Sequence, residues 1–172
     1  MTRFSMALPQ RQARIVYLAL RYHLARPGSE VDPETLQEYA RGLAEVRPHL
    51  EAQLEAEEAT LELTPFQLIR LDTALLSIIN ELKTYPLLDT MAGGSQRPRS
   101  LAPGFDELLR RLFPQVAEDA SSALDVAEEA LMLHRALRAH VARARELLDQ
   151  EREERERTAR RSRRRWQFWR RS

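Results

Sequence analysis

The sequence contains no cysteine, which excludes disulfide bonds, thiolate nucleophiles and cysteine-ligated zinc sites. Only five of its 172 residues are glycine, and none stands in a phosphate-loop spacing, which argues against a glycine-rich nucleotide site. The longest apolar run, residues 74–79, is interrupted by Ser77 and is far shorter than the ~20 residues that a bilayer-spanning helix needs. These absences argue against thiol chemistry, a glycine-rich nucleotide site and a membrane-spanning helix.

The first residues of the chain do not predict a signal peptide. Residues 1–9 contain neither the long apolar region nor the small-residue cleavage site of a signal peptide, so we expect an intracellular protein, located in the cytoplasm. Hydrophobic residues make up 43% of the chain, which is enough for a core. The length fits one domain with an appendage. We expect a helical bundle domain over residues 1–149 and a charged extension over residues 150–172.

The net charge of +1 hides a strong asymmetry. Residues 157–172 contain eight arginines and no acidic residue, so this segment alone carries a charge of +8. The whole chain has 27 basic and 26 acidic residues, so the remaining 156 residues hold 19 basic and 26 acidic groups, a charge of −7. An acidic body followed by a basic tail is more informative than the near-neutral total.

Apolar residues recur at three- and four-residue steps along most of the chain, which predicts α-helices. We expect one helix over residues 9–26, a second that starts at Pro33 and contains Pro48 as a kink or a break, and a third from Pro65 that ends at residues 84–86. A short helix over residues 105–116, interrupted by a proline, and a long C-terminal helix follow.

No segment alternates long enough to predict a strand, because the alternation at Leu61 and Leu63 covers too few residues. The expected fold class is therefore all-α. It is a bundle of about five helices with a long projecting C-terminal helix and a basic-aromatic tail.

The C-terminal helix begins near Ser122 and carries a regular apolar seam, which includes His140. After Asp149 the apolar residues stop, but acid-before-base pairs four residues apart favour helix as far as Arg161. About 40 residues at 1.5 Å per residue span roughly 60 Å, so the helix should project from the body. Part of the seam then lacks a partner within the chain, which predicts a homodimer, with coiled-coil packing, through Ala130, Leu133, Leu137, Ala144 and Leu147.

No set of residues predicts catalysis or a metal site. His134 and His140 are six residues apart on one helix, about 240° around its axis, so they cannot bind one ion together. Paired helical carboxylates can bind metals in bundles, but the Glu-x-x-His motif that accompanies them is missing. We therefore expect a non-enzymatic protein with no catalytic residue, no metal, no cofactor and no small-molecule substrate.

One motif carries a resemblance. Arg135 and His140 stand in a spacing that resembles the Arg-x4–6-His pattern of the HEPN family of helical ribonucleases. The resemblance covers two residues and the all-helical class, and it implies a ribonuclease as a minor alternative. In that alternative His140 would be the base and Arg135 would stabilise phosphate charge.

Acidic residues gather at Glu51, Glu55 and Glu58, which would share a stripe if this segment were helical. Like charges four residues apart mildly destabilise a helix. We interpret the stripe as a solvated face, with a docking site for a basic partner, such as the tail itself, as the alternative.

The tail combines arginines with large aromatic residues, including both tryptophans of the chain. Tryptophan favours the bilayer interface, and arginine is attracted to anionic lipid. We therefore expect peripheral attachment to an anionic membrane, at the inner face of the cell membrane. Nucleic acid is the runner-up, since arginine pairs with phosphate and aromatic rings stack on bases. A groove on a protein partner and a tail without a role remain as further alternatives. The binding residues would be Arg160, Arg161, Arg163, Arg164, Arg165, Trp166, Phe168, Trp169, Arg170 and Arg171.

Overall fold

The computed structural model describes residues 2–25, 33–91 and 104–169, except for the side chains of residues 33–41, 88–91 and 160–169. The elements, in chain order, are β1 (Phe4–Pro9), α1 (Gln10–Ala25), α2 (Pro33–Glu51), β2 (Glu58–Leu63), α3 (Pro65–Met91), α4 (Phe105–Leu112), α5 (Pro114–Glu118), the 3₁₀ helix η2 (Ala120–Ser122) and α6 (Ala123–Trp169). The described chain is a bundle of α-helices with one two-stranded sheet, which confirms the predicted fold class.

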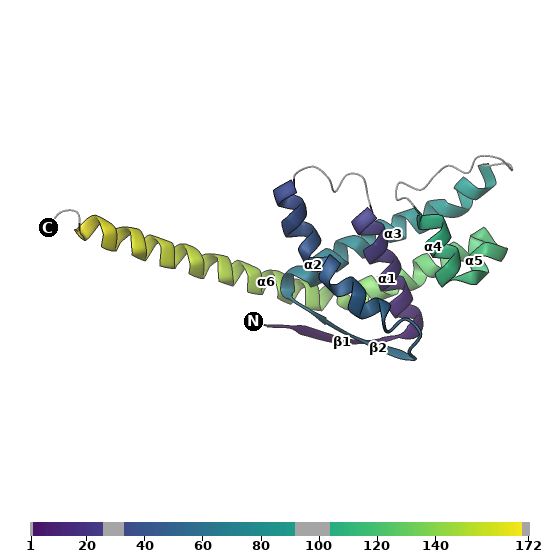
Figure 1. Cartoon of the computed structure of the whole chain (residues 1–172), viewed down its shortest axis with the longest axis horizontal. Coiled ribbons are helices and arrows are strands. Elements are labelled where there is room, and N and C mark those ends of the chain that lie inside the picture. The colour runs from purple at the N-terminus through teal and green to yellow at the C-terminus, as the bar shows by residue number, and fades with distance from the viewer. Residues whose placement is uncertain (1, 26–32, 92–103, 170–172) are drawn as a thin grey trace.

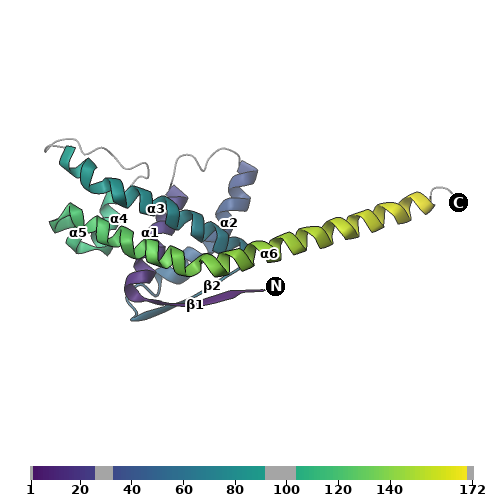
Figure 2. The same cartoon turned by 180° about the vertical axis from the view of Figure 1, so that it is seen from behind.

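Helix α3 forms the centre of the body. It packs along α6 and also contacts α1, α2 and β2, and Figures 1 and 2 show α3 running beside α6 through the length of the body. Its apolar residues occupy two faces, as expected for a central helix. The fully or nearly fully buried ones are Leu68, Leu71, Ala74, Leu75, Ile78, Ile79 and Leu82.

The prediction that the chain forms no strand is wrong. β1 and β2 pair in antiparallel register, with Met6 opposite Leu61 and Phe4 opposite Leu63. The large apolar residues of both strands point to the body and the polar ones to solvent, as the alternating burial of each strand shows. The two strands are far apart in sequence, so neither can bury its apolar face until the helices between them have formed.

The predicted end of the third helix is also wrong. α3 continues through Pro86 to Met91. A proline inside a helix removes one backbone hydrogen bond. Here the residue before the proline, Tyr85, is buried and holds this part of the helix through its side chain. The Tyr85 hydroxyl donates a hydrogen bond to Asp106 of α4, and the Arg110 guanidinium donates to the same hydroxyl at 3.1 Å. These contacts tie the last turns of α3 to α4. Pro48 likewise lies inside a single helix, α2.

The three acidic residues predicted to share a helical stripe lie on three different elements. Glu51 ends α2, Glu55 lies in the turn that follows, and Glu58 begins β2. Glu55 forms an ion pair with Arg14 of α1 at 3.2 Å. Burial, followed by a hydrogen bond to Glu51, raises the pKa of the Tyr17 hydroxyl above its ordinary value. Two of the three carboxylates therefore contact α1, and the stripe does not exist as one helical face.

Candidate functional site

Helix α6 has a packed half and a projecting half. Its last fully buried residue is Ala144, Leu147 and Leu148 are half-buried, and every residue over 149–159 is exposed. The helical backbone nevertheless continues to Trp169, farther than the predicted limit at Arg161. Figures 1 and 2 show this half extending alone, away from all other elements. The 25 residues after Ala144 correspond to about 38 Å of helix.

Ion pairs along the helix surface support the projecting half. Arg155 lies 3.9 Å from Glu151 and Arg157 lies 3.3 Å from Glu153, both with the acid four residues before the base. Such pairs contribute about 0.2–0.5 kcal/mol each to an isolated helix. The hydroxyl of Thr158 also donates a hydrogen bond to the Glu154 carbonyl at 2.9 Å. We call residues 149–169 of α6 the arm. Over residues 149–159, whose side chains are described, the arm is a helix held by local contacts and buries no side chain.

The predicted binding residues lie at the far end of this arm. The backbone of Arg160, Arg161, Arg163, Arg164, Arg165, Trp166, Phe168 and Trp169 is helical, and their side chains lie outside the described part of the structure. Arg170 and Arg171 lie wholly outside it. The structure therefore defines the position of the basic segment, at the tip of a projecting helix.

The residues predicted to form a dimer seam lie mainly in the packed half of α6. Ala130, Leu133, Leu137 and Ala144 are at most 6% exposed in the single chain, on the side of α6 that packs along α3. Leu147 keeps a partly exposed side chain. The fold uses the first four side chains in its own core, so an interface built from them would compete with the packing of α3 on α6.

A polar cluster that sequence reasoning missed lies inside the contact between α3 and α6. Asp72 is buried, and its carboxylate lies 3.0 Å from Nε2 of His134 and 3.8 Å from the guanidinium of Arg145. The side chains of Asp72 and His134 are only 10% and 15% exposed. An acid among the apolar residues of α3 was the one signal in the sequence, and no local pattern names its partners on α6. The cluster joins the two helices.

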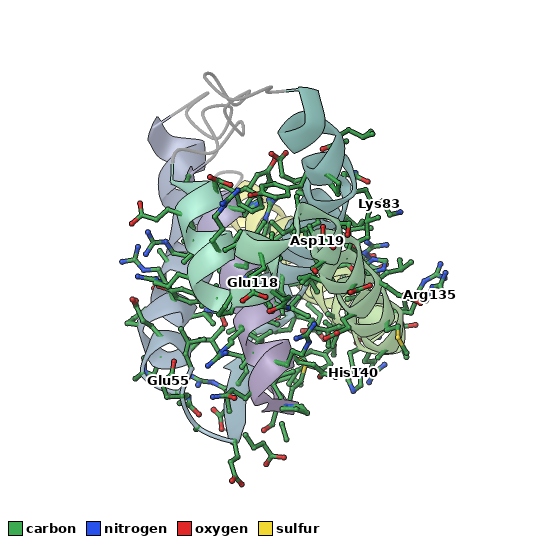
Figure 3. The ribbon with its side chains drawn as sticks, turned by 90° about the vertical axis from the view of Figure 1, so that its right-hand side faces the viewer. Glu55, Lys83, Glu118, Asp119, Arg135 and His140 are labelled. Carbon is green, nitrogen blue, oxygen red and sulfur yellow. The ribbon has the colours of Figure 1, made fainter. Side chains whose placement is uncertain are left out.

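The two residues of the HEPN-like motif do not converge within one chain. Arg135 and His140 are both exposed, and five helical residues place them about 140° apart around α6. Figure 3 shows Arg135 pointing out to solvent while His140 lies lower on the body. The His140 ring makes an edge contact with Phe4 of β1, with 6.1 Å between ring centres. His140 therefore packs on the two-stranded sheet.

Two of the open cavities among the described residues are candidate ligand sites. One, of about 190 Å³, is lined by Arg21, Tyr22, Phe105 and Arg111, and the other, of about 430 Å³, lies between α2, β2 and the start of α3. In the part of the chain that the structure describes, no three histidine, aspartate or glutamate residues gather to hold a metal ion. No helix in that part of the chain is long and apolar enough to cross a membrane.

Comparison with known proteins adds no relative. No family model, curated protein or solved structure matches the chain.

Proposed function

We propose that this protein is a non-enzymatic interaction protein that attaches to an anionic membrane surface through residues 157–172. The observation that supports this proposal best is the projecting half of α6, in which residues 157–169 lie about 20 to 38 Å beyond the last fully buried residue. Arginines near an anionic leaflet contribute about 1 kcal/mol each, and tryptophan adds affinity for the interface.

The length of the arm addresses a problem that the charge distribution creates. Residues 1–149 hold 17 basic and 22 acidic groups, a charge of −5, and an anionic membrane repels such a charge at close range. At physiological salt the Debye length is about 8 Å, so charges several times farther away are largely screened. An arm that stands off the surface lets the +8 segment bind while the acidic body stays beyond the range of repulsion.

The test is co-sedimentation with vesicles of phosphatidylserine and phosphatidylcholine, beside titrations with single-stranded and duplex oligonucleotides. Replacing Trp166, Phe168 and Trp169 with alanine removes interfacial burial and leaves all eight arginines. Binding to vesicles should weaken and become more sensitive to salt, because only screened attraction remains. Replacing Arg163, Arg164 and Arg165 with glutamine should weaken binding mainly at low salt.

A matched control removes the same charge outside the tail. Replacing Arg143, Arg152 and Arg155 with glutamine lowers the net charge by three units, and this change should leave vesicle binding nearly unchanged. Wild-type protein that ignores vesicles but binds oligonucleotide below micromolar concentration would overturn the proposal in favour of nucleic acid. In that event each lost phosphate contact should flatten the log–log salt dependence by roughly one unit.

A further inference from the structure

The exposed large apolar residues of the described chain are confined to α3 and α6. On α6 they are Leu124 and Met132, which are 47% and 63% exposed, and on α3 they are Leu76 and Leu87. Leu131 of α6 is partly buried against the core. Isolated exposed leucines need no explanation, but a set on two helices that pack side by side is a candidate contact surface.

The residues on α6 share one side of the helix. At 100° per residue, the segment from Leu124 to Ala139 places six residues within about 100° of one another. This outer face of α6 consists of Leu124, Glu128, Leu131, Met132, Arg135 and Ala139. Its centre lies about 150° from the buried stripe that packs on α3. Figure 2 shows α6 lying in front of the body from this side, and Figure 3 shows Arg135 of this face pointing into solvent.

The charges on the outer face are symmetric about its apolar centre. Glu128 precedes Leu131 by three residues, and Arg135 follows Met132 by three residues. In an antiparallel pair of α6 helices centred between Leu131 and Met132, Glu128 of each copy lies opposite Arg135 of the other. No ion pair joins Glu128 or Arg135 to another described residue of the same chain. The same register sets Leu131 against Met132 and Leu124 against the small side chain of Ala139.

We propose that the outer face of α6 binds a second copy of this chain, with the two α6 helices antiparallel and Glu128 paired with Arg135 in both directions. The surface is self-complementary in charge and in apolar contact, which is what a two-fold interface requires. A parallel pair in register would place Glu128 against Glu128 and Arg135 against Arg135, so like charges disfavour that arrangement. The buried seam on the opposite side of α6 stays with α3.

Antiparallel pairing determines where the two arms lie. Trp169 is 37 to 38 residues from the centre of the pair, so the two helix tips lie roughly 110 Å apart at opposite ends of the dimer. If the tail binds membranes as proposed above, with each arm standing off the surface, the two tips of one dimer point in opposite directions and contact separate surfaces. This consequence rests on the proposed function, whereas the dimer itself does not.

Charge reversal tests the pairing without vesicles. Sedimentation equilibrium at tens of micromolar should show a dimer for the wild-type protein and a monomer, or at least a tenfold weaker dimer, for Glu128→Arg and for Arg135→Glu. The double variant Glu128→Arg/Arg135→Glu keeps the pairing with signs exchanged and should restore the dimer. Mixing the two single variants should also yield a dimer. Both side chains are exposed, so the thermal melt serves as the control for folding.

A distance measurement tests the orientation. The chain has no cysteine, so Gln150→Cys gives one site for a spin label, and Gln150 is exposed on the arm. The antiparallel register places the two labels about 55 Å apart, whereas a parallel pair would place them within roughly 15 Å. A wild-type monomer, single reversals that leave the dimer unchanged, or a short label distance would each overturn the proposal. Vesicle binding by a monomeric wild type would leave the proposed function standing alone.

Discussion

The two halves of α6 share one helical backbone but are held by different forces. From Ala123 to Ala144 the helix is anchored by a buried apolar stripe against α3. From Asp149 to Ala159 every side chain is exposed, and ion pairs and hydrogen bonds join neighbours on the same helix, such as Arg157 with Glu153. The first half derives its stability from tertiary burial, and the second from local terms of a few tenths of a kcal/mol each.

Because of this difference, substitutions in the packed half and in the projecting half should have different effects on the stability of the domain. A change in the packed half should affect the unfolding of the whole domain, because its side chains belong to the common core. A change in the projecting half should open the helix locally and leave the domain folded, since its described side chains, over residues 149–159, are all exposed. The comparison can therefore be tested by placing substitutions on either side of Leu147.

The largest effect is expected from Leu137→Ala. Leu137 is 5% exposed and lies in the contact of α6 with α3. Removing a buried leucine side chain leaves a cavity and should lower the free energy of unfolding by about 2–5 kcal/mol. Urea denaturation followed by circular dichroism measures this loss. Arg152→Ala on the exposed arm is the control, and an equal loss for both variants would show that the two halves do not differ.

A smaller effect is expected from Asp72→Ala, which removes the carboxylate between His134 and Arg145. The variant leaves a mostly buried imidazole without the carboxylate beside it, a change that should cost about 1–3 kcal/mol. Arg145 is 63% exposed, so solvent screens its share of the cluster. The same urea experiment measures the loss. Stability within about 0.5 kcal/mol of wild type would mean that the apolar contacts alone join α3 to α6.

The helical periodicity of the sequence predicted most of the body correctly. The stripe of Leu68, Leu71 and Leu75 marked the central helix, and the charged repeats after Asp149 predicted that the C-terminal helix projects. Both features depend on the spacing of residues within one element, so the local sequence pattern is enough to predict them.

The features that were missed depend on contacts between distant residues. The pairing of Phe4 with Leu63 and the close contact of Asp72 with His134 each join residues about 60 positions apart. The seam through Leu137 was correctly identified as apolar, but its spacing does not tell whether the partner is α3 or a second chain. The extension of α3 past Pro86 depends on the contact of Tyr85 with Asp106.

The smallest effect on global stability is expected from Glu153→Pro in the arm. Proline in a helix interior costs about 3 kcal/mol locally, which exceeds what the neighbouring ion pairs provide. The helical signal in far-ultraviolet circular dichroism should fall, while the midpoint of the thermal melt stays within about 1 °C because the core is untouched. A melt lowered by several degrees would show that the arm packs on the body.

The most direct test of the central claim compares the full chain with a version that lacks residues 157–172. Both proteins are mixed with vesicles that contain phosphatidylserine, centrifuged and quantified in the pellet, and their thermal melts are recorded in parallel. The account predicts that the full chain pellets with the vesicles, that the shortened chain stays in the supernatant, and that the two melts coincide. A shortened chain that pellets as well as the full one, or a full chain that stays in the supernatant, would contradict it.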